Sequence, residues 1–490
     1  MATLSIDAGT TVIKAVVFSD DGAELAVSAH PTTVSQTHPG WSEQDMDEVW
    51  HSVVSACTDV FSAVHATDID TVAVTAQGDG AWLIDEDGNP LRPAILWNDA
   101  RAADLIAHWD VDGTTDKIFS INGSLPSLGL PNAIMMWLQR EEPQILAQTK
   151  GVLTCGSWIF YKLTGVIGQH ISEASAPWLD IKAGVISDVL IDEYGLKDHR
   201  DRIPPVLSNS QTVAEIRDEL SHDWGLQRGV PCVIAPYDIV ATATGSGATR
   251  PGDAFAILGT TICPGTISPT VQLDGAVTGL NLRGVGDGHF LRAFPTITGA
   301  NTLGWLAKVL SVENLDELNR QAAATPPGSQ GVMWLPYLSP AGERAPFFDP
   351  HAQGLLFGLR ETHGPGEIAR ALFESLGYLI KESLDASGTS PTSLVLSGGG
   401  AQSDLWCQII ADTVGVPTRR TMDSQVGAKG AQIYAQVAQE KYSSVSEAAD
   451  ALVRVADVFE PDTGDKELHH SRYRRFLALR QAIQPFWHEQ

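Results

Sequence analysis

The chain contains the same short text twice, Asp7-Ala8-Gly9-Thr10-Thr11 near the N-terminus and Leu258-Gly259-Thr260-Thr261 half a chain later. Each copy follows an apolar, strand-like run, at residues 4–6 and 255–258. Each predicts a tight turn in which glycine lets the backbone approach a phosphate and threonine supplies amide and hydroxyl donors. Either copy alone is more typical of an ordinary β-turn. Together they predict two homologous halves that bind one nucleotide.

The length and composition indicate an α/β protein of two sizeable domains. A chain of 490 residues is too long for one hydrophobic core. Its 43% hydrophobic and 19% charged residues are typical of a soluble protein. No stretch approaches the roughly 20 apolar residues of a membrane span. The N-terminus enters a strand without an export signal, so we expect a cytoplasmic protein.

The charge balance restricts the possible partners. A formal net charge of −27 argues against nucleic acid and anionic lipid, which need basic patches. ATP is also an anion, so its site needs local loop amides and Mg²⁺. The histidines are scattered without ligand spacing, which argues against a transition-metal site. The 5 cysteines are odd in number and lack Cys-x-x-Cys spacing, so we expect reduced, mostly buried thiols.

The first ninety residues predict a strand, a hairpin and a crossover helix. The turn of the hairpin is Asp20-Asp21-Gly22, and the helix begins near Asp45 with a capping-box pattern. Apolar residues then recur at helical spacing. The expected strands are 3–6, 15–18, 23–29 and 72–75, and the helical stripe is Val49, Val53, Val54, Cys57, Val60 and Phe61. This order is similar to the opening of the ribonuclease-H-like fold of sugar kinases, actin and Hsp70-type ATPases, a likeness that does not itself assign a function.

A similar order recurs in the second half, so the duplication is expected to be structural as well as local. We place the domain boundary near residues 245–252, after an expected strand and helix. The expected elements are strands 232–235, 254–258, 277–282, 289–293 and 393–396, and helices 239–247 and 301–310.

Several longer motifs, spread over nearly the whole chain, resemble the FGGY family of carbohydrate kinases. They are Asp7-Ala8-Gly9-Thr10-Thr11, Gly40-Trp41-Ser42-Glu43-Gln44-Asp45, Ile95-Leu96-Trp97-Asn98-Asp99-Ala100-Arg101, Lys162-Leu163-Thr164-Gly165, Gly342-Glu343-Arg344-Ala345-Pro346 and Ser397-Gly398-Gly399-Gly400-Ala401-Gln402-Ser403-Asp404-Leu405-Trp406. The resemblance implies an α/β fold of two ribonuclease-H-like domains of the actin-like ATPase superfamily, with a catalytic cleft between them. Residues 1–246 would bind the acceptor and carry the catalytic base, and residues 247–490 would bind the nucleotide.

By resemblance, Asp238 is the catalytic base. From the residues alone, an N-cap role before an apolar run is equally compatible, and the two roles can coexist. A carboxylate with an ordinary pKa of about 3.9 cannot deprotonate an alcohol outright. In a loose phosphoryl-transfer transition state it need only orient the hydroxyl and accept its proton late.

Asp7 is the second carboxylate, and the resemblance places it near the nucleotide's Mg²⁺, usually through water. The alternative is an aspartate that ends a strand and caps the following turn. Mg²⁺ prefers oxygen ligands and retains water, so one or two carboxylates, Asp7 and Asp238, with phosphate oxygens suit it.

The residues expected to bind ATP come from both halves. Thr10, Thr11 and Lys14 form the first phosphate loop, where the lysine adds a point charge. The other expected phosphate contacts are Gly259, Thr260, Thr261 and, by resemblance, Gly299. The glycine run at 398–400 removes side chains where a purine must lie flat. The resemblance places Gly400 and Ser403 at the nucleoside, and Gly399 is also expected to bind the nucleotide. A plain strand-to-helix turn is the alternative for this run.

The expected acceptor strip is Gln77-Gly78-Asp79-Gly80, which departs from better-known relatives. Xylulokinases usually carry Met-His and glycerol kinases Arg-Glu at the positions of Gly78 and Asp79. A carboxylate accepts two hydroxyl hydrogen bonds, so Asp79 favours a sugar alcohol over a ketose. Gly78 would leave room for a substrate larger than glycerol. The pair resembles the erythritol-kinase branch, although a Gly-Asp-Gly surface turn is the reading without the family.

Trp97 matches a position where the family packs an indole against the acceptor, and a core tryptophan is the alternative. Trp41 and Glu43-Gln44 are expected to hold the first hairpin against the acceptor pocket. Ile134 stands where the family commonly has lysine. We therefore assign no acceptor contact between residues 118 and 137.

The favoured function is transfer of phosphate from ATP to a terminal hydroxyl of a small polyol, erythritol first. A xylulokinase-like kinase of a ketopentose is the alternative within the class. An actin-like ATPase or nucleotide-binding sensor without an acceptor is an alternative of another class, which Asp238 and the strip at 77–80 argue against. A sugar-binding regulator without catalysis is a third. A homodimer is possible, because dimers are frequent among relatives.

Overall fold

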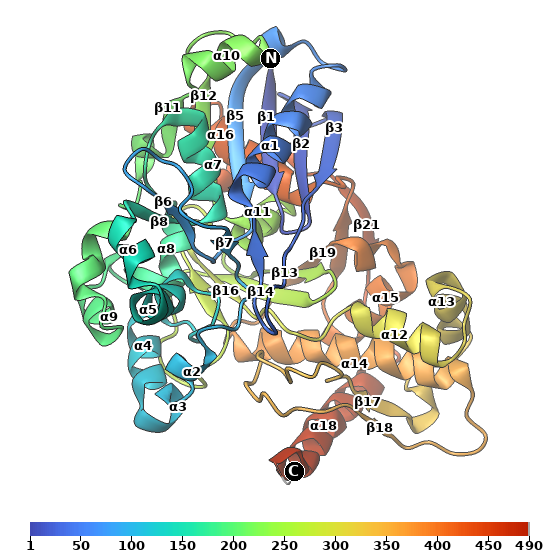
Figure 1. Cartoon of the computed structure of the whole chain (residues 1–490). Coiled ribbons are helices and arrows are strands. Elements are labelled where there is room, and N and C mark those ends of the chain that lie inside the picture. Colours follow the sequence, from blue (N-terminus) through green and yellow to red (C-terminus); the bar gives the residue numbers. More distant parts are fainter. Residues whose placement is uncertain (489–490) are drawn as a thin grey trace. The chain divides into compact units, whose positions relative to one another are not determined.

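The computed structural model describes residues 1–488 and divides into two compact units (Figure 1). The first unit holds residues 1–249, 269–291 and 425–453, and the second holds the rest. The chain first leaves unit 1 after Thr249, inside the expected boundary region. Two later segments return to unit 1, which a division into consecutive domains cannot describe. The functional division at residue 246 stays a prediction.

The first unit is built on a mixed sheet with the strand order β11-β12-β5-β1-β2-β3. The antiparallel pairs β1·β2 and β2·β3 form the expected hairpins, and β1, β5 and β12 are parallel neighbours. The strands are β1 (Ala2–Ala8), β2 (Val12–Ser19), β3 (Glu24–Pro31), β5 (Ile69–Ala76), β11 (Val213–Glu215) and β12 (Pro231–Ile234).

Helices cover both faces of this sheet, because its central strands bury side chains on each face. Leu4 and Ile6 share a core with α1 (Met46–Val60) and α7 (Cys155–Thr164). Ala73 and Val233 pack on α16 (Val426–Ala438). The expected stripe of α1 is largely confirmed: Val49, Val53, Cys57 and Val60 are buried, whereas Val54 and Phe61 are partly buried.

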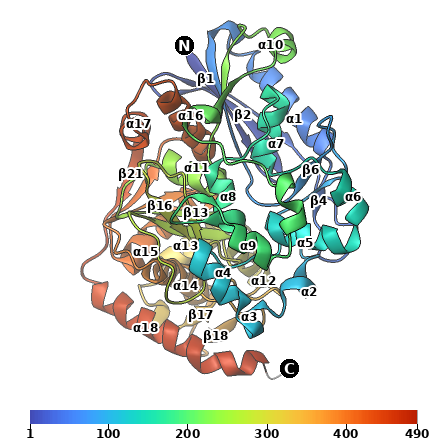
Figure 2. The same cartoon turned by 90° about the vertical axis from the view of Figure 1, so that its left-hand side faces the viewer.

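A helical region follows β5 (Figure 2). It has its own hydrophobic core. Ile118, Ala133 and Trp178 belong to that core. Its helices are α2 (Ala103–Ile106), α3 (Trp109–Asp112), α4 (Thr114–Asn122), α5 (Pro131–Glu141), α6 (Pro143–Gln148), α8 (Ile171–Trp178) and α9 (Asp188–Glu193). α10 (Asp218–Trp224) precedes β12, and α11 (Asp238–Gly245) follows it.

The second unit repeats the pattern with the order β16-β14-β13-β19-β20-β21. β13 and β14 are antiparallel, β13, β19 and β20 are parallel neighbours, and β21 pairs antiparallel with β20. The strands are β13 (Asp253–Leu258), β14 (Ile262–Ser268), β16 (Phe290–Ala293), β19 (Ser393–Ser397), β20 (Thr418–Thr421) and β21 (Val455–Phe459). The main helices are α12 (Asn301–Val309), α13 (Leu315–Ala323), α14 (Pro365–Ala386), α15 (Asp404–Val414) and α18 (Lys466–Ile483).

The structural duplication expected from the sequence is therefore confirmed. β3, β2, β1, β5, β12 and β11 correspond in order to β16, β14, β13, β19, β20 and β21. The strand expected at 277–282 is shorter than predicted, since β15 covers Leu280–Leu282.

Two further sequence expectations can be compared with the described chain. All five cysteines are free and buried, as expected. Among residues 1–488, none of the helices has the length and apolar character needed to cross a membrane.

The start of α1 gives a first test. The Asp45 carboxylate caps the helix by accepting the backbone N–H groups of Asp47 and Glu48, at 2.9 and 3.0 Å. Asp45→Ala should lower the free energy of unfolding by about 1 kcal/mol, whereas Asp45→Ser should retain most of it. Urea denaturation measures both. Equal losses in the two variants would contradict the capping role.

Candidate active site

Three loops of the first unit leave the same edge of its sheet. β1, β5 and β12 are parallel neighbours, so their carboxyl ends lie together. The Gly9 turn follows β1, the strip at 77–80 follows β5, and residues 235–238 follow β12. Ligands bind at this edge in open α/β sheets. The fold thus collects the expected acceptor, base and first phosphate-loop residues of this unit.

Three carboxylates at this edge interact electrostatically. Burial, together with the charges of Asp7 and Asp79, raises the pKa of Asp238 to about 7, although the Ile239 N–H opposes this shift. Burial also raises the pKa of Asp7, which the Lys14 ammonium opposes. The carboxyl of Asp238 therefore exchanges its proton near neutral pH, unlike the ordinary aspartate assumed from the sequence.

The N-cap interpretation of Asp238 is wrong. α11 begins at Asp238 itself, and Tyr237 is the N-cap residue, without a side-chain cap. The Asp238 Oδ1 atom accepts the N–H of the next residue, Ile239, at 2.7 Å. Within residues 1–488, this local backbone bond is the hydrogen bond that holds the carboxylate, which suits a group that has to accept a proton from a ligand.

A buried polar network holds the backbone just before Asp238. The Tyr237 N–H donates to Ser172 Oγ at 3.1 Å, and His170 Nδ1 lies 2.8 Å from the same oxygen. Glu173 accepts the His170 N–H and the Ser157 hydroxyl, at 3.2 and 2.6 Å. Burial lowers the pKa of His170 to about 3, so the imidazole is neutral. Sequence reasoning missed this network. A signal that could have found it is the capping box formed by His170 and Glu173 at the start of α8.

A second network joins the first phosphate loop to the acceptor strip. Trp97 Nε1 donates to Thr10 Oγ1 at 3.0 Å, and this hydroxyl donates to Gln77 Oε1 at 2.8 Å. Gln77 Nε2 donates to Gln44 Oε1 at 2.8 Å, and Gln44 Nε2 returns to the Thr10 carbonyl at 2.7 Å. The structure thus brings together three residues expected in two different roles. Gln44 links Gln77 to the Thr10 carbonyl, a contact that the sequence did not predict.

The motif at 97–101 supports this network from behind. Asp99 accepts the Ser42 N–H at 2.7 Å and pairs with Arg101, whose guanidinium also donates to Glu43 at 2.7 Å. The Arg101 guanidinium lies 4.0 Å from the ring centre of Trp41. These side chains hold residues 41–44 beside Trp97, a role similar to the one expected for Trp41 and Glu43-Gln44.

The remaining first-unit residues lie around Asp7. Lys14 is the cross-strand partner of Asp7 in the β1·β2 register. Thr11 is exposed, and its carbonyl accepts the Thr32 N–H at 3.0 Å. Gly427, near the start of α16, comes so close that a Cβ there would lie 2.9 Å from Asp7 Oδ2. Sequence reasoning missed Gly427, because it lies over 400 residues away along the chain.

In the second unit, the expected phosphate residues form one turn cluster. The Ala300 N–H donates to the Gly259 carbonyl at 3.1 Å. A Cβ at Gly299 would lie 2.4 Å from the Thr260 carbonyl oxygen and 2.4 Å from Thr261 Cα. Gly299 therefore has to be glycine for the two loops to touch.

The glycine run lies beside the same cluster, since β13 and β19 are parallel neighbours. A Cβ at Gly400 would lie 2.3 Å from the ring of Trp406, whereas one at Gly399 would meet open space. The Ser403 hydroxyl accepts the Trp406 N–H at 3.2 Å and donates to Asn319 Oδ1 at 3.0 Å. Ser403 is thus the N-cap of α15, and Asn319 is a neighbour that sequence reasoning did not identify.

Glu343 of the Gly-Glu-Arg motif holds the loop before Gly299. Its fully buried carboxylate accepts the backbone N–H groups of Ile297, Thr298 and Arg344, at 2.6, 3.1 and 3.0 Å. The motif therefore positions the second phosphate loop through the backbone.

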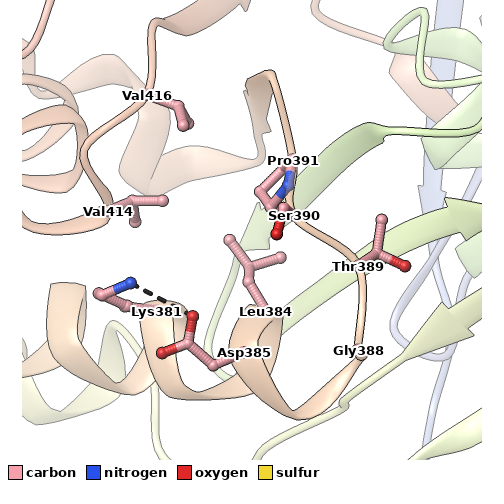
Figure 3. Close-up of a pocket in the computed structure, with 9 residues that line it drawn as sticks. All are labelled: Lys381, Leu384, Asp385, Gly388, Thr389, Ser390, Pro391, Val414 and Val416. Atoms are coloured by element: carbon pink, nitrogen blue, oxygen red, sulfur yellow. Dashed lines mark hydrogen bonds and ion pairs between the residues drawn. The ribbon is translucent and has the colours of Figure 1, made fainter.

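A separate pocket of about 380 Å³ lies at the other end of β19 (Figure 3). It is lined by the end of α14, the turn at 388–391, Val414 and Val416. Lys381 and Asp385 form an ion pair of 3.2 Å on its wall. None of the expected site residues lines it.

Comparisons with known proteins identify the family. Residues 2–245 match the N-terminal domain, and residues 254–439 the C-terminal domain, of the FGGY family of carbohydrate kinases. Xylulose kinase of Escherichia coli is 31% identical over 98% of this chain and 99% of its own. Erythritol kinase of Brucella abortus is 27% identical over 99% of this chain and 96% of its own. The crystal structure of xylulose kinase from Rhodospirillum rubrum has a TM-score of 0.91, at 26% identity over 100% of both chains.

The chain therefore belongs to the FGGY family of carbohydrate kinases. It is a phosphotransferase that acts on a hydroxyl group of a sugar substrate. The expected α/β fold of two ribonuclease-H-like domains is confirmed.

Glu343 provides a test of the second phosphate loop. Glu343→Ala would leave buried N–H groups without an acceptor, each at a cost of about 1–3 kcal/mol. We expect a loss of about 3 kcal/mol in unfolding free energy, measured by urea denaturation. The exposed Glu361→Ala is the matched control and should change stability by less than about 0.5 kcal/mol. Equal effects of the two substitutions would contradict the role of Glu343.

Proposed function

We propose that this carbohydrate kinase phosphorylates a terminal hydroxyl of a small polyol, with erythritol as the favoured substrate. The observation that carries the proposal is the carboxylate of Asp79, whose charge reaches Asp238 at the edge of the first sheet. A carboxylate accepts hydrogen bonds from hydroxyl groups and cannot donate one to a ketose carbonyl. A neighbouring pair of alcohols therefore suits this strip better than a ketone.

Asp238 is the proposed base. A pKa of about 7 matches the ideal for general-base catalysis at neutral pH. Its carboxylate would orient the acceptor hydroxyl and take its proton as the bond to phosphorus forms. The Tyr237 N–H bond to Ser172 and the Ile239 N–H bond fix the backbone and one oxygen of this residue.

ATP and Mg²⁺ are the proposed phosphate donor and metal. Asp7 and Asp238 fit a cation because they are buried carboxylates whose like charges repel. Within residues 1–488, no cluster of three or more His, Cys, Asp or Glu side chains offers a metal cage. Mg²⁺ needs none, since it retains water and uses few carboxylates. When bound, it neutralises phosphate charge during transfer.

The residues proposed to bind the nucleotide keep their expected roles. In the first unit they are Thr10, Thr11 and Lys14. In the second unit they are Gly259, Thr260, Thr261, Gly299, Gly399, Gly400 and Ser403. The open space beside Gly399 and the contact of Gly299 with the Thr260-Thr261 turn support this assignment. The proposed acceptor contacts are Gln77, Asp79, Trp97 and the backbone of Gly78.

A ketopentose kinase is the second candidate. It is favoured by the relative with 31% identity, which is a xylulose kinase. A cytoplasmic location, a possible homodimer and the lack of nucleic-acid and membrane partners stay predictions from the sequence.

Release of ADP with Mg²⁺-ATP tests the acceptor. The panel contains erythritol, glycerol, ribitol, xylitol, arabitol, D-xylulose, L-xylulose and D-ribulose. We expect a polyol to be preferred, and Asp238→Ala to reduce its turnover by about 100-fold or more. Asp223→Ala, at an exposed aspartate, is the matched control. A preferred ketose would overturn the Asp79 argument, whereas acceptor-independent hydrolysis unaffected by Asp238→Ala would favour an ATPase.

The pH dependence tests the electrostatic coupling. Because Asp238 must be ionised to accept a proton, kcat/KM should fall as the pH drops through about 7. Asp79→Asn removes a like charge that raises the pKa of Asp238, so the acid limb should move to lower pH. Asp223→Asn should leave it in place. An acid limb that does not move in Asp79→Asn would contradict the coupling.

A further inference from the structure

The surroundings of Gly78 differ from what the sequence predicts. The prediction that Gly78 leaves room for the acceptor is wrong, because the ring of Tyr237 fills that space. A Cβ on Gly78 would lie 2.3 Å from Cδ2 and 2.5 Å from Cε2 of Tyr237. Ordinary carbon contacts are about 3.5–4.0 Å, so no other residue fits beneath this ring.

The Tyr237 ring, and not the backbone conformation, is what requires glycine at position 78. The φ angle of Gly78 lies outside the left-handed region, so its backbone would accept a side chain. Asp79, the next residue, has a φ of 57° and directs the chain into the turn. Gly78 and Tyr237 are thus a complementary pair, in which one residue gives up its side chain and the other fills the volume.

The pair is adjacent along the chain to two carboxylates of the proposed acceptor site. Gly78 directly precedes Asp79, and Tyr237 directly precedes Asp238. Tyr237 is only 4% exposed, and its backbone N–H donates to Ser172. Such a ring cannot swing aside to admit a bulky ligand without disrupting its packing.

We infer that Tyr237, packed on Gly78, is a specificity-determining residue that limits the acceptor to a short, unbranched polyol. This inference rests on the proposed function and deepens it. In this inference, the ring that fills the volume beside Gly78 bounds the acceptor space next to Asp79 and Asp238 and offers an apolar surface to carbon atoms. An acceptor with additional bulk at that point would meet the ring. Exclusion by bulk discriminates between substrates as effectively as attraction does.

The test compares acceptor preference in four forms of the full chain. Tyr237→Phe keeps the ring, and Tyr237→Ala removes it. Gly78→Ala adds the clashing Cβ, and Gly78→Ala combined with Tyr237→Ala relieves the clash. The readouts are kcat and KM for erythritol, ribitol, xylitol and D-xylulose, the KM for ATP, and the midpoint of thermal unfolding.

We expect Tyr237→Ala to raise kcat/KM for five-carbon acceptors relative to erythritol by about tenfold or more. Tyr237→Phe should keep the parent order of acceptors. Gly78→Ala should unfold at lower temperature, and the double variant should regain part of that loss. The KM for ATP should stay within about twofold in Tyr237→Phe and Tyr237→Ala.

A second glycine-and-ring pair serves as the matched control. A Cβ at Gly265 would lie 2.6 Å from the ring of Phe255, in the sheet of the second unit. Gly265→Ala and Phe255→Ala should lower stability without changing the order of acceptors. An order unchanged in both Tyr237→Ala and the double variant would overturn the inference alone. If the parent chain turned over none of the acceptors, the proposed function would fail first, and the inference with it.

Discussion

At the carboxyl edge of the first sheet, the charges of Asp7 and Asp79 repel the charge of Asp238. Parallel pairing of β1, β5 and β12 brings the three loops together, so these charges cannot avoid one another. Burying like charges costs free energy, and other interactions of the native state have to offset that cost. Lys14 opposite Asp7 and the Ile239 N–H on Asp238 offset part of it. A protein retains such an arrangement where function needs it.

The surroundings of these carboxylates are closely hydrogen-bonded. His170 and Ser172 hold the backbone of Tyr237, while Thr10 and Gln77 bond to each other. Burial raises the pKa of Glu173 and lowers that of His170, so it shifts both groups toward their neutral forms. The layer behind the site thus positions it through hydrogen bonds. Asp238, whose pKa is about 7, is the group proposed to perform the chemistry.

The sequence predicted those features that depend on local pattern. Both turns after β1 and β13, the hairpin and the stripe of α1 follow from periodicity and turn residues over short stretches. The duplicated order of strands followed from the same signals. Features that depend on distant contacts could not be predicted. Gly427 beside Asp7 is one, because nothing in residues 425–453 signals their return to the first unit.

Position 78 shows the same limit within the candidate site. A glycine in a sequence indicates missing volume, but it does not tell what occupies that volume. The structure fills it with a ring from position 237, so the inference from glycine to an open pocket failed. The expectation of an ordinary pKa for Asp238 failed for a similar reason. The residue type can be read from the sequence, whereas the pKa depends on burial and on charges from two other loops.

The two units show how one topology carries two kinds of chemistry. β5 and β19 occupy equivalent places, yet β5 ends in Gln77-Gly78-Asp79 and β19 ends in three glycines. A carboxylate suits hydroxyl groups and repels phosphate, whereas glycine exposes backbone N–H groups and adds no charge. Glu343, the acid of the second loop, is buried and bonded to backbone N–H groups. The carboxyl group of Glu343 faces the backbone, whereas those of Asp79 and Asp238 are the ones proposed to face the acceptor. That difference, rather than the strand order, supports the proposal that the acceptor binds to the first unit.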